Sequence, residues 1–147
     1  MKKMFIAGLM LVAISGSTVA CAQSMPVFKG MKSFTSSFPG AETISCGSLS
    51  NCTEVDFTWK SHQMKAYYDT EGNCSGILRR VPTESLPLFL LMKINESFPG
   101  GVTTQVWEFY NDDKGLSYYV FLAAEKKDYI LQATSAGFVN VIRKIRK

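Results

Sequence analysis

The segment "SSFPGAETIS" occupies residues 36–45, and a second version, "ESFPGGVTTQ", occupies residues 96–105. Both contain the sequence Ser-Phe-Pro-Gly, follow a segment with helical spacing of apolar residues, and precede segments with strand character. Self-similarity at a fixed spacing is typical of one supersecondary unit used twice. We therefore predict that the chain contains an internal structural repeat.

The sequence Phe-Pro-Gly suits the end of a helix. Phe38 and Phe98 are the last apolar residues of the two helical segments. The proline after each Phe cannot continue the helix, and it disfavours helical geometry in the residue before it. Gly40 and Gly100 then have the backbone freedom that a turn from helix into strand requires.

Four strand-like segments follow each helical segment, with turn-like breaks such as "GSLSN", "TEGN" and "NDDKG" between them. The first copy has its helical segment at 26–38 and its strand segments at 41–46, 53–59, 63–69 and 75–81. The second copy has its helical segment at 83–98 and its strand segments at 102–110, 116–124, 128–136 and 138–146. The pattern predicts an α+β protein built from two tandem units, each a helix followed by a four-stranded antiparallel meander.

This pattern resembles the PepSY-like family of small exported bacterial proteins, which are common in Bacteroidetes. The resemblance is carried by "F…FPGA", "V-x-F-x-W", "YYD-x-x-G" and "LP…I-x-x-x-FPG", and it covers essentially the whole mature chain. It implies the β-lactamase-inhibitor-like fold, in which both repeats form one curved antiparallel sheet with the helices on one face. The first repeat would span residues 23–82 and the second 83–147, in one composite domain 23–147.

The first two dozen residues have the layout of a secretory signal peptide. Two lysines precede the apolar segment "MFIAGLMLVAISG" and the small residues of "STVACAQS". Cleavage after residue 22 would release a soluble periplasmic or secreted protein. The segment "TVAC" also resembles a bacterial lipobox, which makes Cys21 a candidate lipidation residue and an outer-membrane lipid anchor the alternative location.

Export would change the net charge of the mature chain and the oxidation state expected of its cysteines. The formal net charge of +4 falls to +2 without Lys2 and Lys3, so nucleic acid is not an expected partner. The oxidising envelope permits a disulfide. Cys46 and Cys52 flank the turn "GSLSN", and we expect them to pair and to leave Cys74 as a free thiol. In the alternative, all three thiols are reduced and buried.

The sequence contains no motif for catalysis, metal binding or cofactor binding. Its one histidine, His62, lies in the turn-like segment "KSHQ", and no HExxH, CxxC, GxGxxG or GxxxxGK[ST] motif is present. The family resemblance also supplies no catalytic residue. We therefore expect no enzyme activity and no cofactor. The resemblance instead implies a non-catalytic envelope module whose partner is a protein, such as an enzyme that it restrains.

Strand alternation indicates where such a partner would bind. The first copy has an apolar face for its helix and a polar outward face that includes Asp56, Thr58 and Lys65. At the positions that we match to these residues, the second copy has Tyr119, Phe121 and Ile130. Exposed apolar patches mark interaction sites. We predict a partner-binding set of Tyr67, Trp107, Tyr119, Phe121, Ile130 and Gln132.

Three further interpretations of this face stay open. A loop or a terminus covers it, or it packs in a homodimer, or the concavity of the sheet binds a small apolar ligand or a peptide.

Overall fold

The computed structural model describes residues 27–147. The expected signal segment 1–22 and Cys21 lie outside the described residues. Within 27–147, no helix has both the length and the apolar character needed to cross a membrane.

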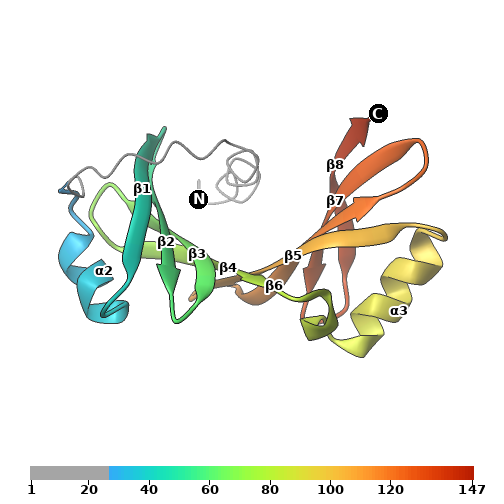
Figure 1. The fold of residues 1–147 in the computed structure, drawn as a ribbon, viewed down its shortest axis with the longest axis horizontal. Coiled ribbons are helices and arrows are strands. Elements are labelled where there is room, and N and C mark those ends of the chain that lie inside the picture. The colour runs from blue at the N-terminus through green and yellow to red at the C-terminus, as the bar shows by residue number, and fades with distance from the viewer. Residues whose placement is uncertain (1–26) are drawn as a thin grey trace.

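Eight strands form one antiparallel sheet, in which each strand pairs with its neighbours in the sequence (Figure 1). The first repeat consists of α2 (Met31–Ser37), β1 (Glu42–Leu49), β2 (Cys52–Trp59), β3 (His62–Asp69) and β4 (Cys74–Val81). The second repeat begins with the 3-10 turn η2 (Thr83–Ser85) and continues with α3 (Leu88–Ser97), β5 (Val102–Asn111), β6 (Gly115–Ala123), β7 (Lys127–Thr134) and β8 (Val139–Arg146). The predicted fold, two helix-plus-meander repeats in one sheet, is confirmed.

The sheet is curved, and both helices lie on its outer side (Figure 1). We call the side away from α2 and α3 the concave face. The two repeats are joined at the pairing of β4 with β5, which runs from Ile77 opposite Tyr110 to Val81 opposite Val106.

The two helix exits have the same geometry. Phe38 and Phe98 cap their helices with backbone φ angles of −126° and −133°, and each donates its N–H to the carbonyl four residues earlier at 2.9 Å. Gly40 and Gly100 follow with φ angles of 75° and 77°. Both angles lie in the left-handed region that favours glycine. The two copies of Phe-Pro-Gly therefore form the same type of turn.

A register shift is repeated as well. The pairing of β1 with β2 shifts between Thr43 and Ser45, and that of β5 with β6 shifts between Thr103 and Gln105. The two shifts lie at the same distance from their helix exits. They are typical of β-bulges, which bend a strand and increase its twist. Both repeats thus bend their first strand at the same place.

Each helix covers the outer side of its own meander. In repeat one, the ring of Phe34 on α2 meets that of Phe57 on β2 edge to face, with 4.9 Å between the ring centroids. In repeat two, Leu90 and Ile94 of α3 pack with Val120 and Leu131, and all four are at most 1% exposed. Burying one such side chain contributes about 2 kcal/mol to stability. Two of the core clusters are therefore helix-on-sheet clusters on the outer side.

The expected disulfide is not formed. Strand β1 runs on to Leu49, so the turn contains only residues 50–51, Leu49 faces Cys52, and Cys46 faces Val55. Cys46 packs into the helix-side cluster of repeat one, whereas Cys52 packs on the concave face. All three described cysteines are free. Thiols on opposite faces of a sheet cannot reach disulfide geometry without a change of register.

The first prediction concerns the helix exits. Gly40→Ala and Gly100→Ala should each lower the free energy of unfolding by about 1 kcal/mol, because an L residue is strained at a left-handed φ. An added Cβ at either position meets no atom within 4 Å, so the cost is conformational only. Gly47→Ala is the matched control, because its Cβ also meets open space and its φ is not positive. Urea unfolding of the three variants measures the effect, and equal losses in all three would contradict it.

The second prediction concerns the thiols. Cys74 is exposed, whereas Cys46 and Cys52 are half-buried. Burial raises the pKa of all three thiols, so the difference in exposure, and not the amount of thiolate, should decide which thiol reacts first. Brief alkylation of the folded protein followed by peptide mapping should find Cys74 modified first. A peptide that links Cys46 to Cys52 under non-reducing conditions would overturn the register described above.

Candidate binding surface on the concave face

A cluster of apolar side chains covers the centre of the concave face. We call it the concave cluster: Tyr67, Leu78, Trp107, Phe109, Tyr119 and Ile130. It draws on every strand from β3 to β7 and includes no residue of α2 or α3. Gly76 makes room for it, because a Cβ there would lie 2.5 Å from the ring of Phe109. A ring on β5 therefore packs across the backbone of β4, at the junction of the repeats.

The predicted binding residues do lie on one face, but they are less exposed than expected. Tyr67, Trp107, Tyr119 and Ile130 are all 3% exposed or less. Phe121 and Gln132 are half-buried. The expectation that this face leaves bare aromatic rings in water is therefore wrong for four of the six residues, since their rings and side chains pack against one another.

The structure also corrects how the two repeats are matched. Thr43 faces Phe57 and Thr103 faces Leu122 at the two register shifts, so residues of β2 and β3 match residues 65 positions later. Tyr119 then corresponds to Glu54, Phe121 to Asp56, and Ile130 to Lys65. The sequence match of Tyr119 with Asp56, and of Phe121 with Thr58, was two residues out of register.

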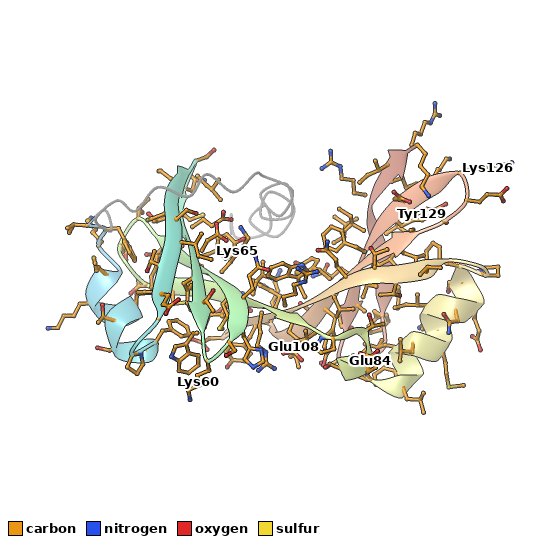
Figure 2. The ribbon with its side chains drawn as sticks, viewed as in Figure 1. Lys60, Lys65, Glu84, Glu108, Lys126 and Tyr129 are labelled. Atoms are coloured by element: carbon orange, nitrogen blue, oxygen red, sulfur yellow. The ribbon has the colours of Figure 1, made fainter. Side chains whose placement is uncertain are left out.

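The matched positions carry opposite chemistry. In repeat one, Lys65 lies 2.7 Å from Asp56 and 3.2 Å from Glu54, and its side chain is only 7% exposed. Figure 2 shows Lys65 on the side of the sheet away from the helices. We call these three residues the charged triad. Two carboxylates and one ammonium give it a formal charge of −1, and Glu54 Oε2 has no hydrogen-bond partner among the described residues.

Burial and charge shift the titration of the tyrosines in the concave cluster. Burial, followed by the charge of Glu54 directly across the strand pair, raises the pKa of Tyr67 well above its usual range. Burial alone raises the pKa of Tyr119 to about 12. The hydroxyl of Tyr119 accepts a hydrogen bond from the side-chain amide of Gln132 at 3.3 Å. Both phenols are therefore held in the protonated form at neutral pH.

A groove opens at one end of the concave cluster. We call it the turn-end groove, because the turns that follow β3, β5 and β7 all line it, and its volume is about 770 Å³. Phe109 connects it to the concave cluster, and Gln132 from the predicted binding set also lines it. A small-molecule or peptide site has a volume of this order.

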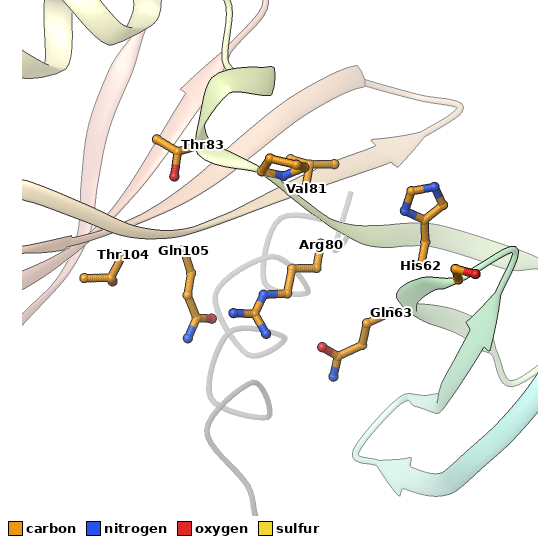
Figure 3. Close-up of a pocket in the computed structure, with 9 residues that line it drawn as sticks. His62, Gln63, Arg80, Val81, Thr83, Thr104 and Gln105 are labelled. Carbon is orange, nitrogen blue, oxygen red and sulfur yellow. The ribbon is translucent and has the colours of Figure 1, made fainter.

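A second groove, of about 400 Å³, lies at the opposite end of these strands (Figure 3). His62, Gln63, Arg80 and Gln105 line it, and no described lining residue is a carboxylate. Figure 3 shows Arg80 beside Gln105, with His62 at the margin of the group. Within residues 27–147, no three histidine, cysteine or acidic side chains come together as a metal site.

Sequence reasoning missed Glu54 as a member of the concave face, and it missed the turn residues that line the turn-end groove. Alternation along β2 could have identified Glu54, since it lies two positions from Asp56. No sequence pattern could have brought the three turns together, because that depends on the pairing of β4 with β5.

The fold is similar to that of several solved Bacteroides structures. A BLIP-like protein from Bacteroides fragilis is 14% identical over 86% of this chain and 91% of its own, with a TM-score of 0.70. A DUF2874 family protein from Bacteroides uniformis is 13% identical over 82% and 89%, with a TM-score of 0.71. A protein from Bacteroides eggerthii, named for an inferred periplasmic location, is 12% identical over 84% and 90%, with a TM-score of 0.72.

No protein-family model matches the chain, and no curated protein matches it. At 12% to 14% identity, the solved structures show a shared fold alone. They confirm that the β-lactamase-inhibitor-like architecture expected from the sequence is the architecture of this chain.

The third prediction concerns alkaline pH. A tyrosine has a pKa of about 10 in an unfolded chain, and that of Tyr119 is about 12 in the folded protein. The folded state therefore favours the protonated phenol. Its stabilising contribution is complete below about pH 10 and is lost as the pH rises toward 12, by at most about 3 kcal/mol.

Urea unfolding at pH 8, 10 and 11.5 tests this expectation. Wild-type protein should lose more stability over this range than Tyr119→Phe does. Tyr110→Phe is the control, since Tyr110 is 50% exposed and its removal should leave the wild-type pH dependence unchanged. Parallel losses in wild type and Tyr119→Phe would show that the phenol of Tyr119 is not protected.

Proposed function

We propose that this chain is an exported, non-catalytic binding module of the bacterial cell envelope that holds a protein partner on its concave face. The observation that carries the proposal is the asymmetry of that face. Where repeat one has the ion pairs of Lys65, repeat two has Tyr119, Phe121 and Ile130 in the same fold. The fold therefore does not require apolar residues there.

The likeness to the BLIP-like protein supports an inhibitor-like role toward an enzyme, and the name of the Bacteroides eggerthii protein supports a periplasmic location. Aromatic side chains carry a large share of binding energy at protein interfaces. On this surface, half-buried Phe121 and Gln132 at the border of the concave cluster offer contact without unfolding of the core.

A small apolar ligand is the second candidate. The turn-end groove favours it, because its volume of about 770 Å³ falls within the range of small-molecule sites. A ligand enclosed within the groove would favour this candidate, whereas contacts spread over several strands would favour a protein partner.

Site-specific photo-crosslinking in the native host tests the proposal, and it is the fourth prediction. A photoreactive phenylalanine analogue at Phe121 should crosslink to an envelope protein. The same analogue at Leu88 should not, because Leu88 is 72% exposed but lies on α3, on the outer side of the sheet. Adducts of twice the protein's own mass would identify a homodimer instead. Equal crosslinking from both positions, or none from Phe121, would contradict binding through the concave face.

A further inference from the structure

We infer that the turn-end groove binds a cationic, apolar segment of the partner, in which a lysine or arginine stands next to an aromatic or aliphatic residue. This inference rests on the proposed function and names the chemistry of the partner. It follows from the floor of the groove, from the charge of its rim, and from the contrast with the groove at the opposite end.

The floor of the groove is apolar and partly open to solvent. Phe109 lines it and is part of the concave cluster. Leu116, which is half-buried and also packs against the helix-side cluster of repeat two, lines it as well, and so does Phe138, which is 66% exposed. A partner side chain seated on this floor would cover apolar surface that now faces water, which favours binding.

The rim of the groove is acidic. Asp69, Asp112 and Asp113 line it together with Lys114, so three carboxylates and one ammonium give a formal charge of −2. The whole chain has a formal charge of +4. The rim therefore differs in sign from the molecule as a whole, and a cationic segment is electrostatically complementary to it.

Hydrogen bonds order the turns of the rim. Asp69 Oδ1 accepts hydrogen bonds from the backbone N–H groups of Glu71 and Asn73, at 2.9 and 2.8 Å, and these bonds lower the pKa of Asp69. Asn111 Oδ1 accepts the N–H of Lys114 at 2.7 Å. Lys93 of α3 donates to the carbonyl of Gly137 at 2.7 Å and so anchors the third turn. A groove held in place before binding loses less entropy when a ligand enters.

The groove at the opposite end has the opposite character. Arg80 is its charged lining residue among those described, and no described acid lines it. A bound segment therefore meets negative charge at the turn end and positive charge at the other end. This difference would place the basic residue of the partner at the turn end, and it would set the direction in which an extended segment lies across the concave cluster.

A second copy of this chain is the main competing occupant. Strand β8 is a sheet edge that carries exposed apolar residues, including Val141 and Ile145, beside basic residues such as Arg143 and Lys144. However, β8 is paired with β7 along its length, so it could enter the groove of a second copy as an extended segment only if that pairing were broken. We assign the groove to a foreign segment, and self-association is an outcome that the test distinguishes.

Selection of short random peptides displayed on phage, against the intact exported protein, tests the inference. Peptides retained by wild-type protein should be enriched several-fold in lysine or arginine beside an aromatic or aliphatic residue. Asp112→Lys reverses a charge at an exposed rim position and should abolish the basic preference. Glu125→Lys is the matched control, since Glu125 is equally exposed in the turn between β6 and β7, outside the groove.

One selected peptide, made synthetically, gives the quantitative measurement. Its dissociation constant should rise about tenfold with Asp112→Lys, with Phe138→Ser, or when its basic residue is replaced by methionine, because a charge-assisted contact or an apolar contact is lost. Leu88→Ser, the control for loss of an exposed apolar side chain, should leave binding unchanged. Binding should also weaken with added salt.

The remaining outcomes separate the two proposals. Peptides that bind the concave face with no basic preference, or with a preference that Asp112→Lys leaves intact, overturn the inference and leave the proposed function standing. If every selected peptide still binds the Phe121→Lys variant, or if no peptide is selected, both the inference and the proposed function are overturned. Oligomers of wild-type protein in sedimentation velocity that Asp112→Lys disperses would assign the groove to a second copy.

Discussion

Each four-stranded repeat has a single helix, and one helix can cover only one face of a sheet. The sharp turn at Phe-Pro-Gly directs both helices to the same side, where Phe34, Leu90 and Ile94 are almost fully buried. Within residues 27–147, no helix covers the other face of the eight strands. Antiparallel sheets commonly leave one face in water. In this protein, strand side chains cover much of that face, either by packing against one another or by forming ion pairs.

The two repeats meet this constraint in different ways. Repeat one places a lysine between two carboxylates on the concave face. The Coulomb attraction in such an arrangement is largely offset by the cost of removing the charges from water. Repeat two places apolar side chains at the same positions, and these belong to one cluster with Tyr67 and Leu78 across the junction of the repeats. Duplication thus kept the scaffold, while the concave positions diverged into a charged half and an apolar half.

The pairing of β4 with β5 joins the charged half and the apolar half in one continuous surface. It aligns the two meanders in one sheet, so that the turns after β3, β5 and β7 come together at one end of the concave cluster. Three acidic residues from two of these turns line the groove there, while Arg80 lies at the opposite end. Residues of both repeats line each end of this surface. A composite site of this kind depends on both halves, which fits a domain that folds and acts as one unit.

The sequence by itself determined the elements and their duplication. Phe-Pro-Gly marks the end of each helix through local backbone chemistry, and alternation along the strands marks which residues share a face. Both signals act over a few residues, so they can be read without the fold. The exact register was not readable in this way. The hairpin of β5 and β6 is longer than that of β1 and β2, which put the sequence match between the second strands two positions out, and the longer β1 placed Cys46 and Cys52 on opposite faces. Burial of Tyr67, Trp107, Tyr119 and Ile130, and the meeting of three turns around one groove, were decided only by the tertiary structure, because both depend on contacts between strands that are distant in the sequence and on the curvature of the complete sheet.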